Sequence, residues 1–334
     1  MIDRTKEKAI RLYTVLPCYN EEEILRSSAE KMMNLYKRLI NAETDVRLSD
    51  RSRIMFINDG SSDSTWSIIQ ELCNQDDLFC GISLSKNCGH QIAIFAGMQY
   101  AVEYNAECVI TIDADLQQDA EAIPKFLKMY LDGCDIVYGV RKSRNTDGLF
   151  KKSSANLYYR FMNLLGCNIV PQSADYRLMS ARAVRSLAEY RESNLFIRGL
   201  VTELGYKTDV VHFDVSRREA GKSKYNLKKM IALALDGITS FSTKPLRWTL
   251  FFGLVASAIS VVMMITTIVD YIRGVTVPGW STLTISIWFI GGVQLLSMGI
   301  MGEYVGRTYI ESKHRPRYFI GDTVGIDHDR DTRG

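Results

Sequence analysis

The sequence CVITIDADLQ, residues 108–117, decides the predicted fold. A short apolar run ends there in two aspartates separated by one residue, Asp113 and Asp115, and an amide side chain follows at Gln117. Such a run is typical of a buried strand in a parallel sheet. Because ligands of open α/β sheets bind beyond the carboxyl ends of the strands, both aspartates are expected to face a binding site.

Two carboxylates this close repel each other unless a cation lies between them. Oxygen ligands with few protein contacts suit Mg²⁺ or Mn²⁺ that arrives with a phosphate-rich substrate. A strand followed by an Asp-rich helix cap would produce the same letters, because Asp is favoured at helix N-termini. These residues alone leave both interpretations open.

Strand-like and helix-like segments alternate around this run. The candidate strands are residues 12–16, 53–57, 81–84, 108–112 and 135–140. Between the first two, apolar side chains from Ile24 to Leu39 recur at helical spacing. The alternation predicts βαβ units and a mostly parallel sheet.

Polar clusters follow the first two candidate strands as well. Residues 17–22 are PCYNEE, and residues 58–63 are NDGSSD. The carboxyl ends of parallel strands meet at one edge of a sheet. Independent helix caps could produce each cluster, but three clusters at one edge favour a shared cleft.

The composition bounds the function. The chain has 334 residues and a net charge of +3, which gives no indication of nucleic-acid binding. Its seven cysteines lack metal-ligand spacing and are predicted to be reduced core thiols on the cytosolic side. The charged N-terminus MIDRTKEKAI predicts no signal peptide.

Two long uncharged stretches predict a helical hairpin in a membrane. Residues 250–269 and 281–302 contain no charged side chain, and each is long enough to cross a hydrocarbon core of roughly 30 Å. Basic residues flank both outer ends, so the positive-inside rule puts both ends in the cytosol. Segments 150–166 and 225–241 suit basic helices at an anionic membrane surface, although helices packed on the sheet would look the same.

Motifs of several other enzyme classes are missing from the sequence. Gly221–Ser223 is like the tail of a P-loop, but Ser216 stands where the earlier glycine is required. No GxGxxG follows the first candidate strand, which disfavours a dinucleotide-binding fold. Neither HExxH nor GxSxG occurs, so the commonest hydrolase motifs are absent.

Several motifs, taken in order, resemble the signature of family 2 glycosyltransferases with the GT-A fold. They are LPCYNEE at 16–22, NDGSSDST at 58–65, SKNCGHQ at 85–91 and DADLQ at 113–117. SADYRLM at 173–179 and GKSKY at 221–225 narrow the resemblance to the polyprenyl-phosphate branch, which is similar to bactoprenol glucosyltransferases and dolichol-phosphate mannose synthase. The resemblance covers about residues 11–318.

The resemblance implies a role for each matching residue. Asp113 would lie near the ribose or the metal, and Asp115 would hold Mg²⁺ or Mn²⁺ on the diphosphate with Gln117 as a partner. Asp175 matches the position of the catalytic carboxylate, so Asp115 and Asp175 are the predicted catalytic residues. Gln118–Asp119 departs from the shorter ending of this motif in the family, so the resemblance does not predict the loop after Gln117. The nucleoside would be cradled by Pro17, Tyr19, Asn20, Glu21 and Asp59.

An acceptor phosphate would need basic partners, because Arg and Lys match phosphate oxygens. The candidates are Arg141, Arg144, Arg177, Lys222, Ser223 and Lys224. A solvated positive face attracted to anionic lipid would explain Arg144 and Lys224 as well. A lipid phosphate is already mostly dianionic at cytosolic pH, so Asp175 is predicted to orient groups or restrain a basic residue more than to remove a proton. His90 is expected to pack or donate hydrogen bonds and has no predicted role in the chemistry.

The predicted organisation is a cytosolic GT-A domain at 1–224, an amphipathic juxtamembrane helix at 225–245, two transmembrane helices within 246–306 (about 248–270 and 281–303) and a cytosolic basic tail at 307–334. The resemblance implies metal-dependent, inverting transfer of a hexose to undecaprenyl or another polyprenyl phosphate, at the cytosolic face of the bacterial cytoplasmic membrane. UDP-glucose is the favoured donor, while GlcNAc, galactose or an aminoarabinose derivative could be the transferred sugar instead. Whether the protein forms a homo-oligomer is also left open. The alternatives are a processive polysaccharide synthase, although the QxxRW segment usual in such enzymes is missing, and a non-catalytic module that binds nucleotide sugar.

Overall fold

The computed structural model describes residues 9–41, 45–141, 173–192, 195–213, 244–273 and 279–326. Two compact units divide the chain. The first comprises Met1–Tyr159, Asn168–Lys224 and Pro316–Gly334, and the second comprises Arg160–Cys167 and Tyr225–Arg315. The first unit contains every described strand and both aspartates of the DADLQ motif.

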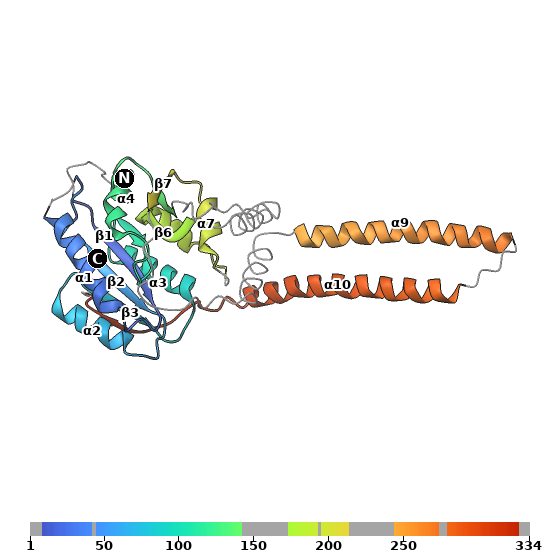
Figure 1. Ribbon diagram of the computed structural model, residues 1–334, viewed down its shortest axis with the longest axis horizontal. Helices are drawn as coiled ribbons and strands as arrows, with labels where there is room; N and C mark the ends of the chain where they lie inside the picture. Colours follow the sequence, from blue (N-terminus) through green and yellow to red (C-terminus); the bar gives the residue numbers. More distant parts are fainter. Residues whose placement is uncertain are drawn as a thin grey trace, which may run out of the picture. The chain divides into compact units, whose positions relative to one another are not determined.

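The first unit is built on one sheet with the strand order β7-β5-β6-β4-β1-β2-β3-β8 (Figure 1). The strands are β1 (Leu12–Cys18), β2 (Arg53–Asn58), β3 (Phe79–Leu84), β4 (Cys108–Thr111), β5 (Ile136–Arg141), β6 (Ser173–Ser180), β7 (Thr208–Phe213) and β8 (Ile320–Val324). Strands β1 to β5 and β7 run parallel, whereas β6 and β8 run against them. The predicted α/β fold with a mostly parallel sheet is confirmed, and the ends of β1 to β5 differ from prediction by at most two residues.

Strand β6 determines where the site forms. It lies between β4 and β5 and runs antiparallel to both. An antiparallel strand begins at the sheet edge where its parallel neighbours end, so residues near the start of β6 lie beside the carboxyl end of β4. Thr111 pairs with Arg177 in this register, and this pairing brings the SADYRLM and DADLQ motifs to the same edge.

Helices cover both faces of the sheet. One face carries α1 (Leu25–Ile40), α2 (Thr65–Gln75) and α4 (Ile123–Leu131), and the other carries α3 (His90–Glu103) and α6 (Ala181–Ala188) (Figure 1). A short helix, α7 (Ile197–Glu203), precedes β7. The described cysteines are free and most of them are buried, as predicted for core thiols.

Helix α3 lies close to the sheet because it carries a glycine at the contact. A Cβ added to Gly97 would stand 2.4 Å from Val15 Cγ1 and 2.8 Å from Ile57 Cγ1. Val15 and Ile57 belong to β1 and β2, the strands whose ends carry two of the predicted loops. Gly97 therefore sets the depth at which α3 packs, and with it the position of the first turn of α3.

The C-terminal segment returns to the sheet, which the prediction of a basic tail at 307–334 did not include. Strand β8 pairs with β3 as the antiparallel edge strand. Before β8, the Arg317 guanidinium lies 4.8 Å from the centre of the Phe95 ring and donates to the carbonyl oxygens of Tyr190 and Glu192. Tyr318 donates to Gln99 Oε1 at 2.9 Å, so this segment is fastened to α3 at two points.

The second unit contains two long helices, α9 (Lys244–Ile272) and α10 (Trp280–Ser312). The predicted spans, 250–269 and 281–302, fall inside these helices. Across the residues that are described, no helix combines the length and the apolar character needed to cross a membrane. The predicted juxtamembrane helix at 225–245 lies almost wholly outside the described residues.

Candidate active site

In the loop after β4, hydrogen bonds from the next residues hold both aspartates: the side-chain amide of Gln118 bonds to Asp113, and the backbone N–H of Gln117 bonds to Asp115. Asp113 donates its backbone N–H to Gln118 Oε1 at 3.0 Å, and Gln118 Nε2 donates to Asp113 Oδ2. Gln117 donates its backbone N–H to Asp115 Oδ1 at 3.2 Å. Leu116 adopts a positive φ of 45°, which closes the turn between them. The buried Gln118, a departure from the family pattern, therefore orients Asp113.

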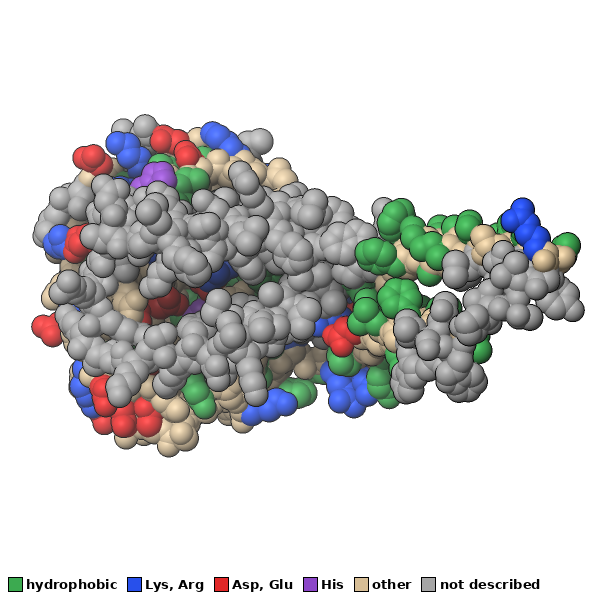
Figure 2. All heavy atoms as spheres, turned by 45° about the vertical axis from the view of Figure 1, so that its right-hand side comes forward, with side chains coloured by type: hydrophobic (Ala, Val, Ile, Leu, Met, Phe, Trp, Pro, Cys, Tyr) green, Lys and Arg blue, Asp and Glu red, His purple; other side chains and the backbone are tan. Residues whose placement is uncertain are grey.

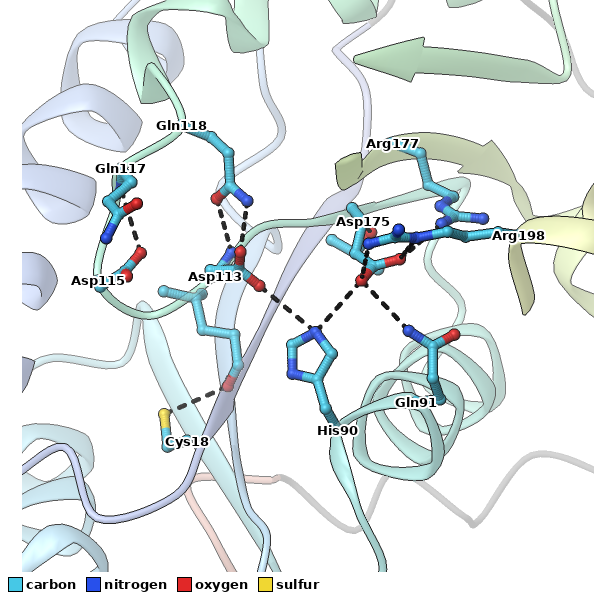
Figure 3. Close-up of polar contacts among 12 residues, drawn as sticks. Cys18, His90, Gln91, Asp113, Asp115, Gln117, Gln118, Asp175, Arg177 and Arg198 are labelled. Atoms are coloured by element: carbon cyan, nitrogen blue, oxygen red, sulfur yellow. Dashed lines mark hydrogen bonds and ion pairs between the residues drawn. The ribbon is translucent and has the colours of Figure 1, made fainter. Parts of the chain in front are cut away.

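Asp175 occupies the first half of β6 and is the most densely bonded carboxylate of this edge. Arg177 Nη2 donates to Oδ1 at 2.9 Å, Arg198 Nε donates to Oδ1 at 3.0 Å, and Arg198 Nη2 donates to Oδ2 at 2.9 Å. Gln91 Nε2 adds a bond to Oδ2 at 3.2 Å (Figure 3). Although burial raises the pKa of Asp175, its bonds to His90 and Arg198 and the charges of both arginines hold that pKa well below its usual value. Asp175 is therefore an ionised anchor for basic side chains.

Arg177, one of the predicted ligands of the acceptor phosphate, is a buried side chain paired with Asp175. The Arg177 side chain is only 2% exposed and bonds to Asp175. Residues two apart on a strand share one face of the sheet, so the register that places Asp175 also buries Arg177. Its Nε and Nη1 have no hydrogen-bond partner among the described residues, and an acceptor cannot reach them from solvent.

His90 lies between the two motifs. Its Nε2 is 3.5 Å from Asp113 Oδ1 and 3.5 Å from Asp175 Oδ2 (Figure 3). Burial lowers the pKa of His90, but the bond to Asp175 and the charges of Asp113 and Asp175 raise it above its usual value overall. His90 begins α3, directly after Gly89, so α3 delivers this side chain to the strand edge.

The predicted nucleoside-binding residues lie on two loops that bond to each other. Asn20, with a positive φ of 54°, accepts the backbone N–H of Ser62 at 2.9 Å. Glu21 donates its backbone N–H to Thr65 Oγ1 at 3.0 Å. Pro17 lies near the end of β1 and pairs with Ile57 of β2. The side chain of Tyr19, just after β1, is exposed. The loops after β1 and β2 thus form one wall of the site.

Asp59 joins a third loop to this wall. Its carboxylate oxygens accept the backbone N–H groups of Cys88 at 2.7 Å and Gly89 at 2.9 Å. The residue is 3% exposed. Burial raises the pKa of Asp59 above its usual value, although the two backbone bonds act to lower it. Asp59 therefore shapes the loop that leads into α3 and His90.

Of the remaining candidates for phosphate binding, only Arg141 lies within the described residues. Arg141 is exposed at the carboxyl end of β5, on the edge where Asp113 and Asp175 lie. Arg144, Lys222, Ser223 and Lys224 lie outside the described residues.

The aspartates of the loop fit a metal ion that arrives with its substrate. In the described part of the chain, no group of three or more His, Cys, Asp or Glu side chains is placed to hold a metal. Mg²⁺ is commonly bound by one or two carboxylates together with substrate phosphates and water, and Asp113 and Asp115 supply such a pair. Burial raises the pKa of Asp113, His90 lowers it and the charge of Asp175 raises it, so added positive charge would stabilise the ionised carboxylates.

Sequence reasoning missed Arg198 and Gln91 and gave His90 no part in the site. Gln91 and His90 are inside the SKNCGHQ motif that carries part of the family resemblance, so their place in that motif could have marked them. Arg198 stands in an ordinary helical context, and only the three-dimensional position of α7 brings it to Asp175.

Comparisons with known proteins identify the family of this chain. Residues 13–187 match the family described as Glycosyl transferase family 2. The uncharacterized glycosyltransferase YkoT of Bacillus subtilis is 43% identical over 92% of this chain and 90% of its own length. The bactoprenol glucosyl transferase of Shigella phage SfV is 40% identical over 93% and 98%, and the prophage bactoprenol glucosyl transferase homolog of Escherichia coli is 38% identical over 93% and 98%.

Solved structures show a weaker likeness. The mannosyltransferase PcManGT of Pyrobaculum calidifontis, in complex with GDP-Man and Mn²⁺, matches 88% of each chain at 12% identity and a TM-score of 0.44. Glucosyl-3-phosphoglycerate synthase of Mycobacterium tuberculosis matches 70% of this chain and 79% of its own at 16% identity and a TM-score of 0.42. Likenesses of this size carry no argument about this chain. The family match and the long curated relatives show that this chain is a glycosyltransferase with a GT-A-like α/β fold and that it belongs to glycosyltransferase family 2.

Proposed function

We propose that the protein transfers a hexose, with glucose from UDP-glucose as the favoured donor, to a polyprenyl phosphate. The observation that carries this proposal is the meeting of Asp113 and Asp175 on either side of His90 at one sheet edge. One carboxylate belongs to the loop that would take a nucleotide-sugar diphosphate, and the other holds Arg198, a partly exposed basic side chain that suits a phosphate-bearing acceptor. Relatives named bactoprenol glucosyl transferase support this acceptor.

The donor half of the site would use the loops after β1, β2 and β4. The bonded loops containing Asn20 and Ser62 would hold the nucleoside. Asp113 and Asp115, aided by Gln117, would hold Mg²⁺ or Mn²⁺, which when bound neutralises charge on the departing diphosphate. Gln118 holds Asp113 by two hydrogen bonds, which leaves Asp113 Oδ1 for this role.

The acceptor half needs orientation more than proton removal. A phosphate monoester with a second pKa of about 6 is mostly dianionic at neutral pH, so its oxygen is already a competent nucleophile. Asp175 holds Arg198 by two hydrogen bonds and keeps a positive charge near the incoming phosphate. Attack from the side opposite the leaving diphosphate would invert the anomeric carbon.

We also propose that the second unit anchors the enzyme in the bacterial cytoplasmic membrane, with the first unit on the cytosolic side. The support is the uncharged sequence at 250–269 and 281–302 and the apolar side chains exposed along α9 and α10 (Figure 2). Phe252, Val262, Leu295 and Leu296 are each at least 60% exposed. A lipid environment would bury such side chains, and it would bring a lipid acceptor to the enzyme.

The test uses the full-length protein in detergent, labelled UDP-glucose, undecaprenyl phosphate and Mg²⁺ or Mn²⁺. We expect label in the lipid extract when the acceptor carries its phosphate and none with undecaprenol. Label that enters a polymer would favour a polysaccharide synthase. Donor binding without release of UDP would favour a non-catalytic module, and either result would reject the proposal.

A further inference from the structure

The imidazole of His90 contacts the two carboxylates that define the two halves of the site. The distances from Nε2 are 3.5 Å to Asp113 Oδ1 and 3.5 Å to Asp175 Oδ2. His90 is 46% exposed, whereas the Asp175 side chain is 10% exposed. Figure 3 shows the imidazole between the two carboxylates.

The chemistry of this arrangement requires a proton on Nε2. Both carboxylate oxygens are acceptors only, and an imidazole nitrogen can hold them together only as an N–H donor. One N–H directed between the two acceptors would favour both contacts and so hold the two carboxylates at a set separation. Without it, Asp113 and Asp175 would face each other as like charges with no donor between them.

The fold holds His90 in place from both sides. Gly89, the residue before it, donates its backbone N–H to Asp59 at 2.9 Å. Gln91, the residue after it, donates to Asp175 at 3.2 Å. Farther along α3, Gly97 allows close packing on β1 and β2. The imidazole therefore sits on the first turn of a helix that is packed on the sheet and is hydrogen-bonded on both sides of His90.

We propose that His90 is a positioning residue that sets the donor loop against the Asp175 assembly through the shared Nε2–H. This inference rests on the proposed function, since it assigns Asp113 to the donor and Asp175 to the acceptor side. Transfer requires the reacting atoms to lie about 3–3.5 Å apart, and a misplacement of about 1 Å can cost about 100-fold in rate. His90 thus acts on the chemical step and not on the binding of either substrate.

The experiment compares two nearly isosteric variants of the full-length enzyme, His90→Gln and His90→Met. Glutamine keeps an N–H donor at a similar reach, and methionine does not. We expect His90→Met to lower kcat for lipid glucosylation by about 10- to 100-fold, with KM for UDP-glucose and for undecaprenyl phosphate changed by less than about 3-fold. His90→Gln should recover most of kcat. His212→Gln, at an exposed position on β7, is the control and should match the wild type.

The inference is overturned if His90→Met keeps the wild-type kcat, if both variants lose kcat equally, or if the loss appears in KM. Because the side chain is nearly half exposed, unfolding is not expected; should His90→Met unfold, His90→Asn against His90→Leu repeats the comparison. A wild-type enzyme that makes no glucolipid would reject the proposed function alone. The role of His90 would then be tested on UDP-glucose hydrolysis, where the same order of variants is expected and an equal rate for all of them would reject it.

Discussion

At the scale of single residues, Asp175 explains why the site holds so many basic groups. Two arginines and one histidine surround one carboxylate that is almost excluded from solvent. A carboxylate with these partners is a poor proton acceptor, because each partner favours its ionised form. It can, however, fix the direction of each side chain that bonds to it.

This role predicts the behaviour of Asp175→Asn. The amide keeps the shape but loses the charge, so we expect kcat to fall by about 100-fold through loss of orientation, with no recovery at higher pH. In the wild type, the pKa of Asp175 is depressed, so Asp175 stays ionised and gives no acid limb above about pH 4. A kcat profile from pH 5 to 9 measures this. An acid limb that disappears in Asp175→Asn would show that Asp175 is a base.

The depressed pKa of Asp175 also determines how its contribution to the stability of the fold depends on pH. The folded pKa of Asp175 lies below its unfolded value, so its contribution to stability is present above about pH 3.9 and is lost as the pH falls through the folded pKa.

Arg177→Met distinguishes a buried structural charge from a substrate ligand. Removing one partner of a buried ion pair costs about 3–5 kcal/mol, and Arg198 still pairs with Asp175, so we expect a cost near the lower end, about 3 kcal/mol. Chemical unfolding of the purified protein measures it. A stable variant with a raised KM for the lipid acceptor would restore Arg177 to the role that its sequence position indicated.

The sequence was sufficient for residues whose chemistry is written in a short motif. Asp113 and Asp115 follow a strand directly, and strand ends are predictable from apolar runs. The burial of Arg177 and the part played by Arg198 were not predictable, because one follows from the register of β6 and the other from the position of α7, more than twenty residues away from Asp175. Register and helix placement depend on contacts far apart in the chain.

At the scale of elements, α3 connects the packing of the sheet to the geometry of the site. Its first turn supplies His90 and Gln91, and its middle rests on β1 and β2 at Gly97. Arg317 and Tyr318, from the end of the chain, contact its outer side. A change under α3 should therefore reach Asp175.

Gly97→Ala tests this connection. The new methyl group would stand 2.4 Å from Val15 Cγ1, so α3 or the sheet must shift, at a cost of about 1–3 kcal/mol. We expect a lower midpoint of thermal unfolding together with a lower kcat. The control is Gly205→Ala, where no atom lies within 4 Å of the added Cβ but the positive φ of 67° gives backbone strain; it should lose stability and keep kcat per folded molecule. Equal kcat in both variants would separate α3 packing from catalysis.

Strands with a clear apolar run were predictable, and β8 at the edge of the sheet was not. Strands β1 to β5 follow one another with helices between them, and their apolar runs match the prediction closely. Strand β8 joins β3 across more than two hundred residues. Its sequence, IGDTV, is too short and too polar to predict an edge strand.

At the scale of the whole molecule, the proposal needs the chain to reach a lipid. Large apolar side chains such as Phe289 and Leu296 are exposed on α10 by 67% each. Soluble proteins rarely expose apolar surface this continuously. If these helices lie in lipid, the protein should stay in the membrane fraction after washing with high salt and with alkaline carbonate, and detergent should release it. Release by salt alone would contradict the anchor.

The most direct test of the account counts products in one reaction with UDP-glucose, a divalent cation and undecaprenyl phosphate. The account predicts one glucosyl lipid for each UDP released by the wild type, and almost no UDP from Asp115→Asn. UDP release matched by free glucose, or release at the same rate without the lipid phosphate, would contradict it.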